Sequence, residues 1–142
     1  MQTFTVHIAN WHDDAPSLRL VREVVFIREQ QVPVELEWDG LDATCLHVLA
    51  RSSAGDAVGT ARLLADGHIG RMAVLEDWRG RGVGSALLLR LLEEARRRGL
   101  QQAVLNAQIE AAGFYAKFGF RAEGETFMDA GIPHIKMVLL LH

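Results

Sequence analysis

The stretch from Arg79 to Ser85 constrains the fold of this chain more than any other part of its sequence. It is rich in glycine and lies between an apolar segment, Ile69 to Val74, and an amphipathic segment that runs from about Val83 to Arg98. A strand, a Gly-rich turn and a helix that begins directly after the turn form a unit that binds phosphate. Glycine permits positive φ and a close backbone approach, and the first helical N–H groups have no partner within the helix. We therefore predict an anion site at this turn.

The spacing of the glycines excludes two common phosphate-binding loops. There is no Gly-Lys-Ser/Thr, so the turn is not the P-loop, which needs that lysine and a hydroxyl group for magnesium. Leu87 stands where the dinucleotide fingerprint Gly-x-Gly-x-x-Gly needs its last glycine. The pattern that remains is Arg-x-x-Gly-x-Gly, formed by Arg79, Gly82 and Gly84, and Arg81 adds a second positive charge. Because such a turn also occurs without a ligand, the rest of the chain has to decide its role.

Length, charge and cysteine content indicate one soluble intracellular domain. The chain has 142 residues and a net charge of −3, which provides no overall basic field for nucleic acid or an anionic membrane. The basic run Arg96 to Arg98 is offset by Glu93 and Glu94. The single cysteine, Cys45, cannot form an intrachain disulfide, and no Cys/His cluster has the spacing of a zinc site. No segment resembles a signal peptide or a membrane span, so we expect a cytoplasmic protein without a metal.

The periodicity of the apolar residues predicts an α/β domain with a mixed, mostly antiparallel sheet and the element order β-α-β-β-β-α-β-α-β-β. Each predicted strand is apolar or alternates with period two, and each predicted helix carries an apolar stripe. The predicted strands are Thr3 to Ala9, Cys45 to Arg51, Val58 to Ala65, Ile69 to Val74, Ala103 to Ala107, Phe120 to Glu125 and Ile132 to Leu140. The predicted helices run from about Asp13 to Gln30, from Val83 to Arg98 and from Ala111 to Phe118.

Local signals add detail to this arrangement. Asp66-Gly67 predicts a two-residue hairpin before the strand that leads to the turn. The helix that follows the turn should return the chain to a strand parallel to Ile69–Val74. On its polar face we expect the ion pairs Glu93–Arg97 and Glu94–Arg98. Residues 31–43, which contain Pro33 and several acidic residues, read as a polar loop.

The order of the elements and three motifs resemble the GNAT family of N-acetyltransferases. The pattern at Arg79 to Ser85 is similar to the acyl-CoA pyrophosphate loop of that family, and Met72-Ala73-Val74 looks like the strand that pairs with the pantetheine arm. The segment Phe114 to Phe120 resembles its closing helix, in which tyrosine is followed four and five residues later by glycine and phenylalanine. These matches place an acyl-CoA-binding core at about residues 45–140 of a single domain that spans residues 1–142.

Four further segments are similar to the ElaA/YjcF-like branch of the GNAT family. They are Arg28-Glu29-Gln30 with Val32, Asp39-Gly40-Leu41-Asp42 with His47, Leu105-Asn106-Ala107-Gln108, and Gly131-Ile132-Pro133-His134. The branch does not imply a definite substrate. It does extend the resemblance over the first helix and the polar loop, which the three core motifs leave out.

The resemblance implies that the turn and the strand before it bind acetyl-CoA. The implied contacts come from Met72, Ala73, Val74, Arg79, Gly80, Arg81, Gly82, Val83, Gly84, Ser85 and Asn106. By the same resemblance the backbone N–H of Val74 polarises the thioester carbonyl, and the strand separates from its neighbour to admit it. The only tyrosine, Tyr115, is the implied general acid, because a phenol with a pKa near ~10 can protonate a thiolate whose conjugate acid lies near ~8.5. Without that role Tyr115 would be an aromatic core residue.

The general base and the acceptor site remain open at this point. Acidic and histidine side chains and a water chain are all possible bases; the side chains are Glu29, Glu37, Asp39, Asp42, His47 and His134. Glu37, Gln108 and His134 are the candidates for contact with the acceptor, and the amides of Asn106 and Gln108 either bind a ligand or satisfy backbone groups. The acidic run from Glu35 to Asp42 favours a cationic acceptor if it borders the entrance, and is otherwise a solvated loop.

The expected function is transfer of an acetyl group from acetyl-CoA to a primary amine of a small molecule, by direct attack in a ternary complex. Cys45 lies far from the turn in sequence, so an acyl-cysteine route is not expected. The alternatives are a CoA-binding module without turnover, and acetylation of a protein N-terminus or lysine. A homodimer is also expected as a possibility, with the apolar strand Met137 to Leu141 as the sheet edge that pairs.

Overall fold

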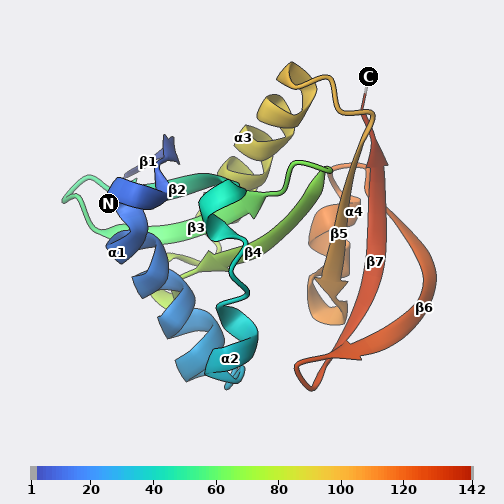
Figure 1. Ribbon diagram of the computed structural model, residues 1–142, viewed down its shortest axis with the longest axis horizontal. Helices are drawn as coiled ribbons and strands as arrows, with labels where there is room; N and C mark the ends of the chain where they lie inside the picture. Colours follow the sequence, from blue (N-terminus) through green and yellow to red (C-terminus); the bar gives the residue numbers. More distant parts are fainter. Residues whose placement is uncertain (1–2, 142) are drawn as a thin grey trace.

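Seven strands form one sheet in the order β1-β2-β3-β4-β5-β7-β6 in the computed structural model, which describes residues 3–141 (Figure 1). All neighbouring strands are antiparallel except β4 and β5, which are parallel. The strands are β1 (Phe4–Ala9), β2 (Leu46–Ser52), β3 (Ala57–Leu63), β4 (His68–Val74), β5 (Gln102–Gln108), β6 (Arg121–Asp129) and β7 (Ile132–Leu140). The predicted mixed, mostly antiparallel α/β fold is confirmed.

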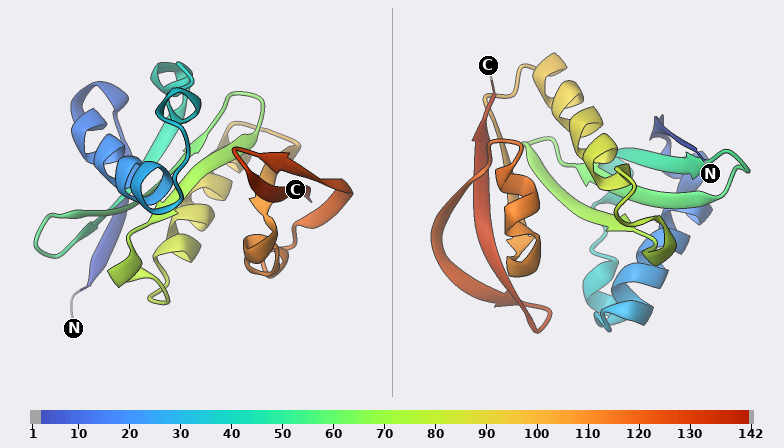
Figure 2. Two further views of the ribbon diagram at one scale, coloured as in Figure 1. Left: turned by 90° about the horizontal axis from the view of Figure 1, so that it is seen from below. Right: turned by 180° about the vertical axis from the view of Figure 1, so that it is seen from behind.

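Helices cover both faces of the sheet (Figure 2). On one face lie α1 (Trp11–Arg22), its continuation as the π-helix η1 (Glu23–Glu29), and α2 (Val34–Glu37). On the other face lie α3 (Val83–Arg97) and α4 (Ala112–Ala116). Short 3₁₀ turns fill three connections: η2 (Asp42–Thr44), η3 (Glu76–Trp78) and η4 (Ile109–Ala111).

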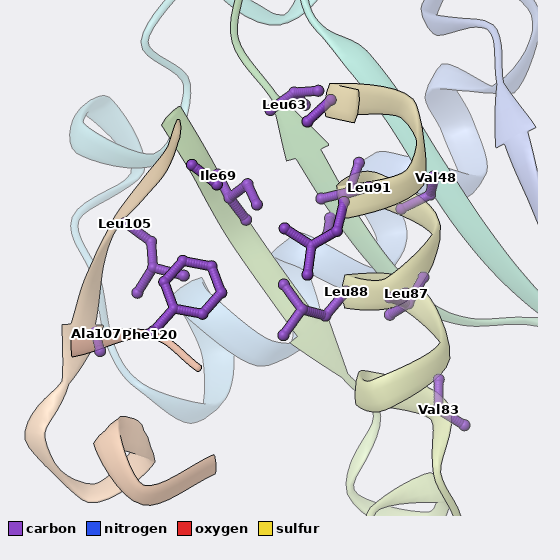
Figure 3. Packing of buried hydrophobic residues seen from close by; sticks show 14 of the residues in the cluster. Val48, Leu63, Ile69, Val83, Leu87, Leu88, Leu91, Leu105, Ala107 and Phe120 are labelled. Carbon is purple, nitrogen blue, oxygen red and sulfur yellow. The ribbon is translucent and has the colours of Figure 1, made fainter. Parts of the chain in front are cut away.

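The apolar periodicity of the sequence is the origin of the two-sided core. All seven residues of β3 are buried, because this strand has helices on both faces. The stripe of α3, which includes Leu87, Leu88 and Leu91, points at residues of β2, β4 and β5 (Figure 3). On the opposite face Leu18 and Val21 of α1 are fully buried against the sheet. The two helices therefore hold the central strands from both sides.

The two parallel strands separate soon after they meet. β4 and β5 pair only at His68–Val104 and Ile69–Leu105, although each strand continues for several residues. On its other side β4 carries a bulge, since Thr60 faces Ala73 while Arg62 faces Gly70. Two residues of β4, one of them Arg71 with φ +50°, thus oppose a single residue of β3. The second half of β4 consequently has a free edge toward β5, as the sequence prediction of a separated strand requires.

The first helix begins before its predicted start and ends next to Gln30 as predicted, but its last part is not α-helical. It begins at Trp11, because the side chain of Asn10 accepts the N–H of His12 at 2.8 Å and caps the helix. The α-helical part ends at Arg22, and the chain continues as a π-helix in which Gln30 N–H donates to the carbonyl of Val25. The apolar spacing does not indicate this change of hydrogen-bond register.

Residues 31–43 do not form the solvated polar loop that the sequence predicted. The segment contains α2 and η2, and it buries Glu37 and Asp42 to 2% and 5% exposure. Arginine partners from other elements, described below, make that burial possible.

Three smaller predictions also need correction. The hairpin at Asp66-Gly67 encloses three residues rather than two, since Leu64 N–H donates to His68 O across it. Glu94 pairs with Arg90 and Arg97 and not with Arg98, whereas the Glu93–Arg97 pair is present. The strand that contains Met137 is not a sheet edge, because β7 lies between β5 and β6. At this end of the sheet the edge strand is β6, and all of its residues are exposed.

Candidate functional site

A cavity of about 430 Å³ lies where β4 and β5 separate. Its walls come from these two strands, from the segment of residues 26–37, from Tyr115 of α4, and from the β6–β7 hairpin. The cavity brings together residues that the sequence analysis proposed for the donor, the acceptor and the chemistry: Met72, Glu37, Asn106, Gln108, Tyr115 and His134. The other proposed donor contacts, at residues 73–74 and 79–85, are not among its lining residues. Segments distant in sequence thus form one site at the separation of the strands.

The backbone N–H of Val74 points into the gap between β4 and β5. Leu75 N–H donates to Val58 O at 2.9 Å, so this residue pair is a hydrogen-bonded one. Hydrogen-bonded and non-hydrogen-bonded pairs alternate in an antiparallel ladder, and Val74, which faces Gly59, is therefore a non-hydrogen-bonded position. Its N–H and C=O point away from β3, toward the side where β5 has separated. The position suits a donor to a carbonyl oxygen in that gap.

The Gly-rich turn has the geometry of an anion site. Gly80 and Gly82 have φ of +74° and +85°, and a Cβ at either position would meet no other atom within 4 Å. Gly82 precedes α3 without a side-chain cap, and the first intrahelical bond runs from Ala86 N–H to Gly82 O. The N–H groups of residues 83–85 therefore have no partner within the helix, at the positive end of its dipole. The predicted strand-turn-helix unit is present.

The two arginines of the turn are engaged within the protein. Arg79 binds both carboxylate oxygens of Glu29, at 2.7 and 2.8 Å, and its Nε donates to Val74 O at 3.0 Å. The guanidinium of Arg81 lies over the ring of Trp78 at 4.9 Å. Both were expected to support phosphate binding, and the structure shows them bordering the turn with other partners.

Tyr115 links α4 to β4 at the wall of the cavity. Its hydroxyl contacts the sulfur of Met72 at 3.6 Å, and its ring packs edge-on against Phe114 and Phe120. Burial raises the pKa of Tyr115 to about 12, so the phenol is neutral across the physiological range. The residue is thus both part of the aromatic packing and a hydrogen-bond donor in the cavity.

The amides at the end of β5 have different surroundings. Gln108 Nε2 donates to Gln30 Oε1 at 2.9 Å, which ties β5 to the segment that follows η1. Asn106 is exposed and lines the cavity. Gln108 therefore holds the wall in place, whereas the amide of Asn106 faces the space that a ligand would enter.

A closed ring of six charged side chains forms part of one wall of the cavity, which Glu37, Arg62 and Arg71 line. Arginines and carboxylates alternate around it, and each makes contacts on both sides. The closest contacts are Arg22–Glu37 at 2.7 Å, Glu37–Arg71 at 3.2 Å, Arg71–Asp39 at 3.2 Å, Asp39–Arg62 at 2.5 Å, Arg62–Asp42 at 2.9 Å and Asp42–Arg22 at 2.6 Å. With three charges of each sign the ring is neutral.

The ring changes the meaning of the acidic run. Arginines neutralise Glu37, Asp39 and Asp42, so these carboxylates do not form a negative field at the entrance. The hydrogen bond from Arg62 holds the pKa of Asp39 well below its ordinary value. The argument for a cationic acceptor therefore loses its basis, and so does the alternative of a solvated loop.

Sequence reasoning missed the arginines of this ring. Arg22 follows Val21 and lies one helical turn from Leu18 on the buried face of α1, and Arg62 lies in a wholly buried strand. Charged residues are rarely buried without a partner. A basic residue on an apolar stripe was thus an available signal that acidic partners lie nearby.

Three of the candidate bases are unsuited to that role. The hydrogen bond from Arg79 lowers the pKa of Glu29. Asp42 accepts from two arginines of the ring. His47 is 1% exposed, donates from Nε2 to Asp42 O at 2.8 Å, and stacks on Trp11, and its burial lowers its pKa. It does not line the cavity.

His134 has the geometry of a proton acceptor. Its Nδ1 lies 2.7 Å from the carbonyl of Ile132. A carbonyl oxygen only accepts, so Nδ1 carries the proton and Nε2 has a lone pair in the neutral ring. The ring stacks on Phe127 and lines the cavity. The structure thereby combines a defined tautomer with a position at the site.

Other chemistry has no counterpart in the part of the chain that is described. Among residues 3–141, no group of three or more His, Cys, Asp or Glu side chains could hold a metal ion. No helix in the same range is long and apolar enough to cross a membrane. Cys45 lies outside the cavity, donates from its sulfur to Leu41 O, and has a pKa raised by burial, which is unfavourable for a nucleophile.

Comparison with known proteins adds independent information. Residues 25–141 match the family described as acetyltransferase (GNAT) domain. The uncharacterized N-acetyltransferase YjcF from Bacillus subtilis is 39% identical over 122 residues, which cover 83% of this chain and 86% of that protein.

Two solved structures are similar over nearly the whole chain. ElaA from Escherichia coli is 29% identical with a TM-score of 0.85, and an acyl-CoA N-acyltransferase from Pseudomonas aeruginosa is 31% identical with a TM-score of 0.85. Each comparison covers 96% of this chain and 99% of the other.

Proposed function

Because the chain belongs to the GNAT family of acyl-CoA-dependent N-acetyltransferases, in its ElaA/YjcF-like branch, we propose that it transfers an acetyl group from acetyl-CoA to a primary amine of a small molecule. The observation that carries the proposal is the separation of β4 from β5 directly before the Gly-rich turn. Because of this separation, β4 has a free edge that includes the N–H of Val74. This edge and the N-terminus of α3 lie along one continuous path. The acceptor meets the donor in a single ternary complex.

The donor fits the residues along this path. The N–H groups of residues 83–85 and the turn at Gly80 and Gly82 would bind the pyrophosphate, with Arg79 and Arg81 as nearby charges. The free edge at residues 72–74 offers backbone groups to the amides of the pantetheine arm, and Asn106 faces the same space. The bound thioester supplies an activated acyl group, which the protein has to orient and polarise.

Three groups of this chain act on the reacting atoms in the proposal. Val74 N–H stabilises negative charge on the carbonyl oxygen. Such a donor is already oriented toward the oxygen and needs no reorganisation during the reaction. The amine nitrogen forms a bond to the acyl carbon while the carbon–sulfur bond breaks, and Tyr115 donates to the departing sulfur. Burial keeps the phenol of Tyr115 protonated at physiological pH, so it can donate its proton to the departing sulfur as the general acid of the proposal. The proton that the new amide nitrogen loses restores the phenol, and the products are the amide and the free thiol.

His134 is the base in this proposal. An amine attacks only as the free base, so an ammonium proton has to leave the acceptor. The lone pair of Nε2 can take it, because the Ile132 carbonyl holds the proton on Nδ1. Glu37 and Gln108 line the same cavity and remain the proposed acceptor contacts, Glu37 as a member of the charged ring and Gln108 while its Nε2 donates to Gln30.

The dimensions and charge of the cavity support a small acceptor. A volume of about 430 Å³ lies in the range of small-molecule sites. The neutral ring in its wall offers no excess of negative charge to a polyamine. A cytoplasmic location and a possible homodimer remain further parts of the proposal, supported respectively by the unpaired Cys45 and by the exposed edge strand β6.

The test is thiol release from acetyl-CoA with a panel of monoamines, polyamines, amino acids, aminoglycosides and short peptides. We expect turnover with one class of small amine. Turnover only with peptides would move the function to acetylation of protein N-termini or lysines. CoA binding without turnover on any acceptor would support a non-catalytic CoA-binding module, for which the retained Tyr115 has no use.

A further inference from the structure

The corner between η1 and α2 is held in an unfavourable backbone conformation. η1 is a π-helix, in which Val32 N–H also reaches back to Phe26 O at 2.8 Å. π-helices are rare and occur mostly at functional sites. Gln31 has φ +58°, a region that residues with a side chain adopt at a cost. Side-chain contacts outside the segment have to maintain this corner.

Two side-chain bridges hold the corner at its centre. Glu29, the last residue of η1, forms the two-bonded ion pair with Arg79 of the Gly-rich turn. The next residue, Gln30, accepts from Gln108 at the end of β5. The first bridge joins the corner to the Gly-rich turn, which is the proposed donor site. Gln30, Val32 and Leu36, which lie in or beside the corner, line the proposed acceptor cavity. One ion pair therefore connects the two halves of the site.

The ion pair is well placed to be exchanged for a ligand. The side chains of Glu29 and Arg79 are 38% and 41% exposed, and exposed ion pairs contribute little to stability. Arginine binds phosphate with the same two-bonded geometry that it uses for a carboxylate, and such charge-assisted bonds are strong. Glu29 thus occupies in the free protein the donors that a phosphate would use.

We propose that Glu29 is an internal competitor of the acyl-CoA pyrophosphate: donor binding transfers Arg79 from Glu29 to phosphate and releases the corner at residues 29–33. This inference rests on the proposed function, because it takes acyl-CoA as the ligand of the turn. Release of the corner alters the wall of the acceptor cavity, so filling the donor site changes the acceptor site. The coupling is reciprocal for the two binding equilibria, so a bound acceptor changes the affinity for the donor by the same factor.

The opposite role for Glu29 would be to hold Arg79 ready for the phosphate. The two roles predict opposite changes in the affinity for CoA when Glu29 is replaced by a neutral residue. If Glu29 competes with phosphate, its neutral variant binds CoA more tightly; if Glu29 positions Arg79, the same variant binds CoA more weakly. The affinity for CoA therefore decides between them without knowledge of the acceptor.

The first experiment is calorimetric titration of CoA into the wild-type chain, Glu29→Gln and Glu23→Gln. Glu23 is the matched control, because it lies on the same π-helix, loses the same charge and pairs only with the exposed Arg28. We expect Glu29→Gln to lower the Kd about two- to fivefold, the range of an exposed ion pair, and Glu23→Gln to leave it unchanged. A higher Kd for Glu29→Gln, or an equal decrease for both variants, would overturn the proposal.

The second experiment is amide hydrogen exchange with and without saturating CoA. In the wild type we expect protection at residues 80–86 together with faster exchange at residues 29–32. In Glu29→Gln the corner should exchange fast already, and CoA should add little. Protection of the turn without any change at the corner would refute the exchange of partners while the proposed function stands. A wild-type chain that binds no CoA at all would instead refute the proposed function.

Discussion

Replacement of Tyr115 by phenylalanine separates the chemical role of this residue from its packing role. The variant keeps the ring and its edge-on contacts with Phe114 and Phe120. It removes only the hydroxyl, whose contact within the protein is the sulfur of Met72 at 3.6 Å. Thioether sulfur is a weak acceptor. We therefore expect the free energy of unfolding to change by less than about 1 kcal/mol.

The expected effect on turnover is much larger. The hydroxyl lies in a mostly buried environment, where a hydrogen bond to a developing thiolate is stronger than in water. Loss of one preorganised donor to a developing anion typically lowers kcat by about 10²- to 10³-fold, or about 3–4 kcal/mol. Because the pKa of Tyr115 is raised to about 12, the phenol stays protonated and wild-type activity should show no loss from its ionisation up to about pH 10.

The assay measures kcat by thiol release and the Kd of CoA by calorimetry. Tyr115→Phe should lower kcat and leave the Kd within about twofold, since no change in ground-state binding is involved. Phe118→Leu is the control, because it disturbs the same aromatic cluster at Phe114 without removing a hydroxyl. Its kcat should remain close to the wild-type value. Equal kcat for Tyr115→Phe and the wild type would remove Tyr115 from the chemistry.

Two other predictions follow from the geometry of the site. His134→Gln should lower kcat about 100-fold, because the lone pair on Nε2 is lost as a proton acceptor, and an unchanged kcat would exclude His134 as the base. The exposed His12→Gln is its control. Asp39 has a lowered pKa in the folded state, so its contribution to stability is present above about pH 4 and is lost as the pH falls. Urea unfolding of Asp39→Asn should therefore show a lower stability at pH 7, by about 1–3 kcal/mol, and a weaker decline below pH 4; parallel curves would contradict the ring assignment.

The parts of the fold that could be predicted from sequence are those with local causes. The turn at Gly82 and Gly84, the apolar strand before it and the stripe of α3 all depend on neighbouring residues. Their spacing predicted the strand-turn-helix unit without any knowledge of the sheet. The resemblance to the GNAT family then suggested the role of general acid for Tyr115. Its neighbours in sequence alone suit a core residue equally well.

The parts that could not be predicted depend on contacts between distant residues. Arg22 reaches partners 15 and 20 residues away, and nothing in the local pattern of residues 31–43 distinguishes a paired carboxylate from a solvated one. The bulge at Arg71 gives no signal, because glycine would be the expected residue at φ +50°. The edge position was assigned wrongly to Met137–Leu141, since hydrophobicity does not determine the order of strands.

The choice of His134 as base depended partly on the sequence and partly on the structure. The sequence offered His134 as one of several possible bases. The hydrogen bond to Ile132, only two residues away, favours it over Glu29 and Asp42, which arginines engage. A local contact thus supports the proposal of one base among those that the sequence pattern left open.

The central claim is that the Gly-rich turn and the free edge of β4 bind acyl-CoA, and calorimetric titration of CoA into the wild type and Gly82→Glu tests it most directly. A side chain at Gly82 would extend into open space at the turn, and glutamate adds a negative charge where the phosphate should lie. We predict saturable binding of one CoA per wild-type chain and no measurable binding to a folded Gly82→Glu chain. Equal affinity of the two chains, or no binding to the wild type, would contradict the account.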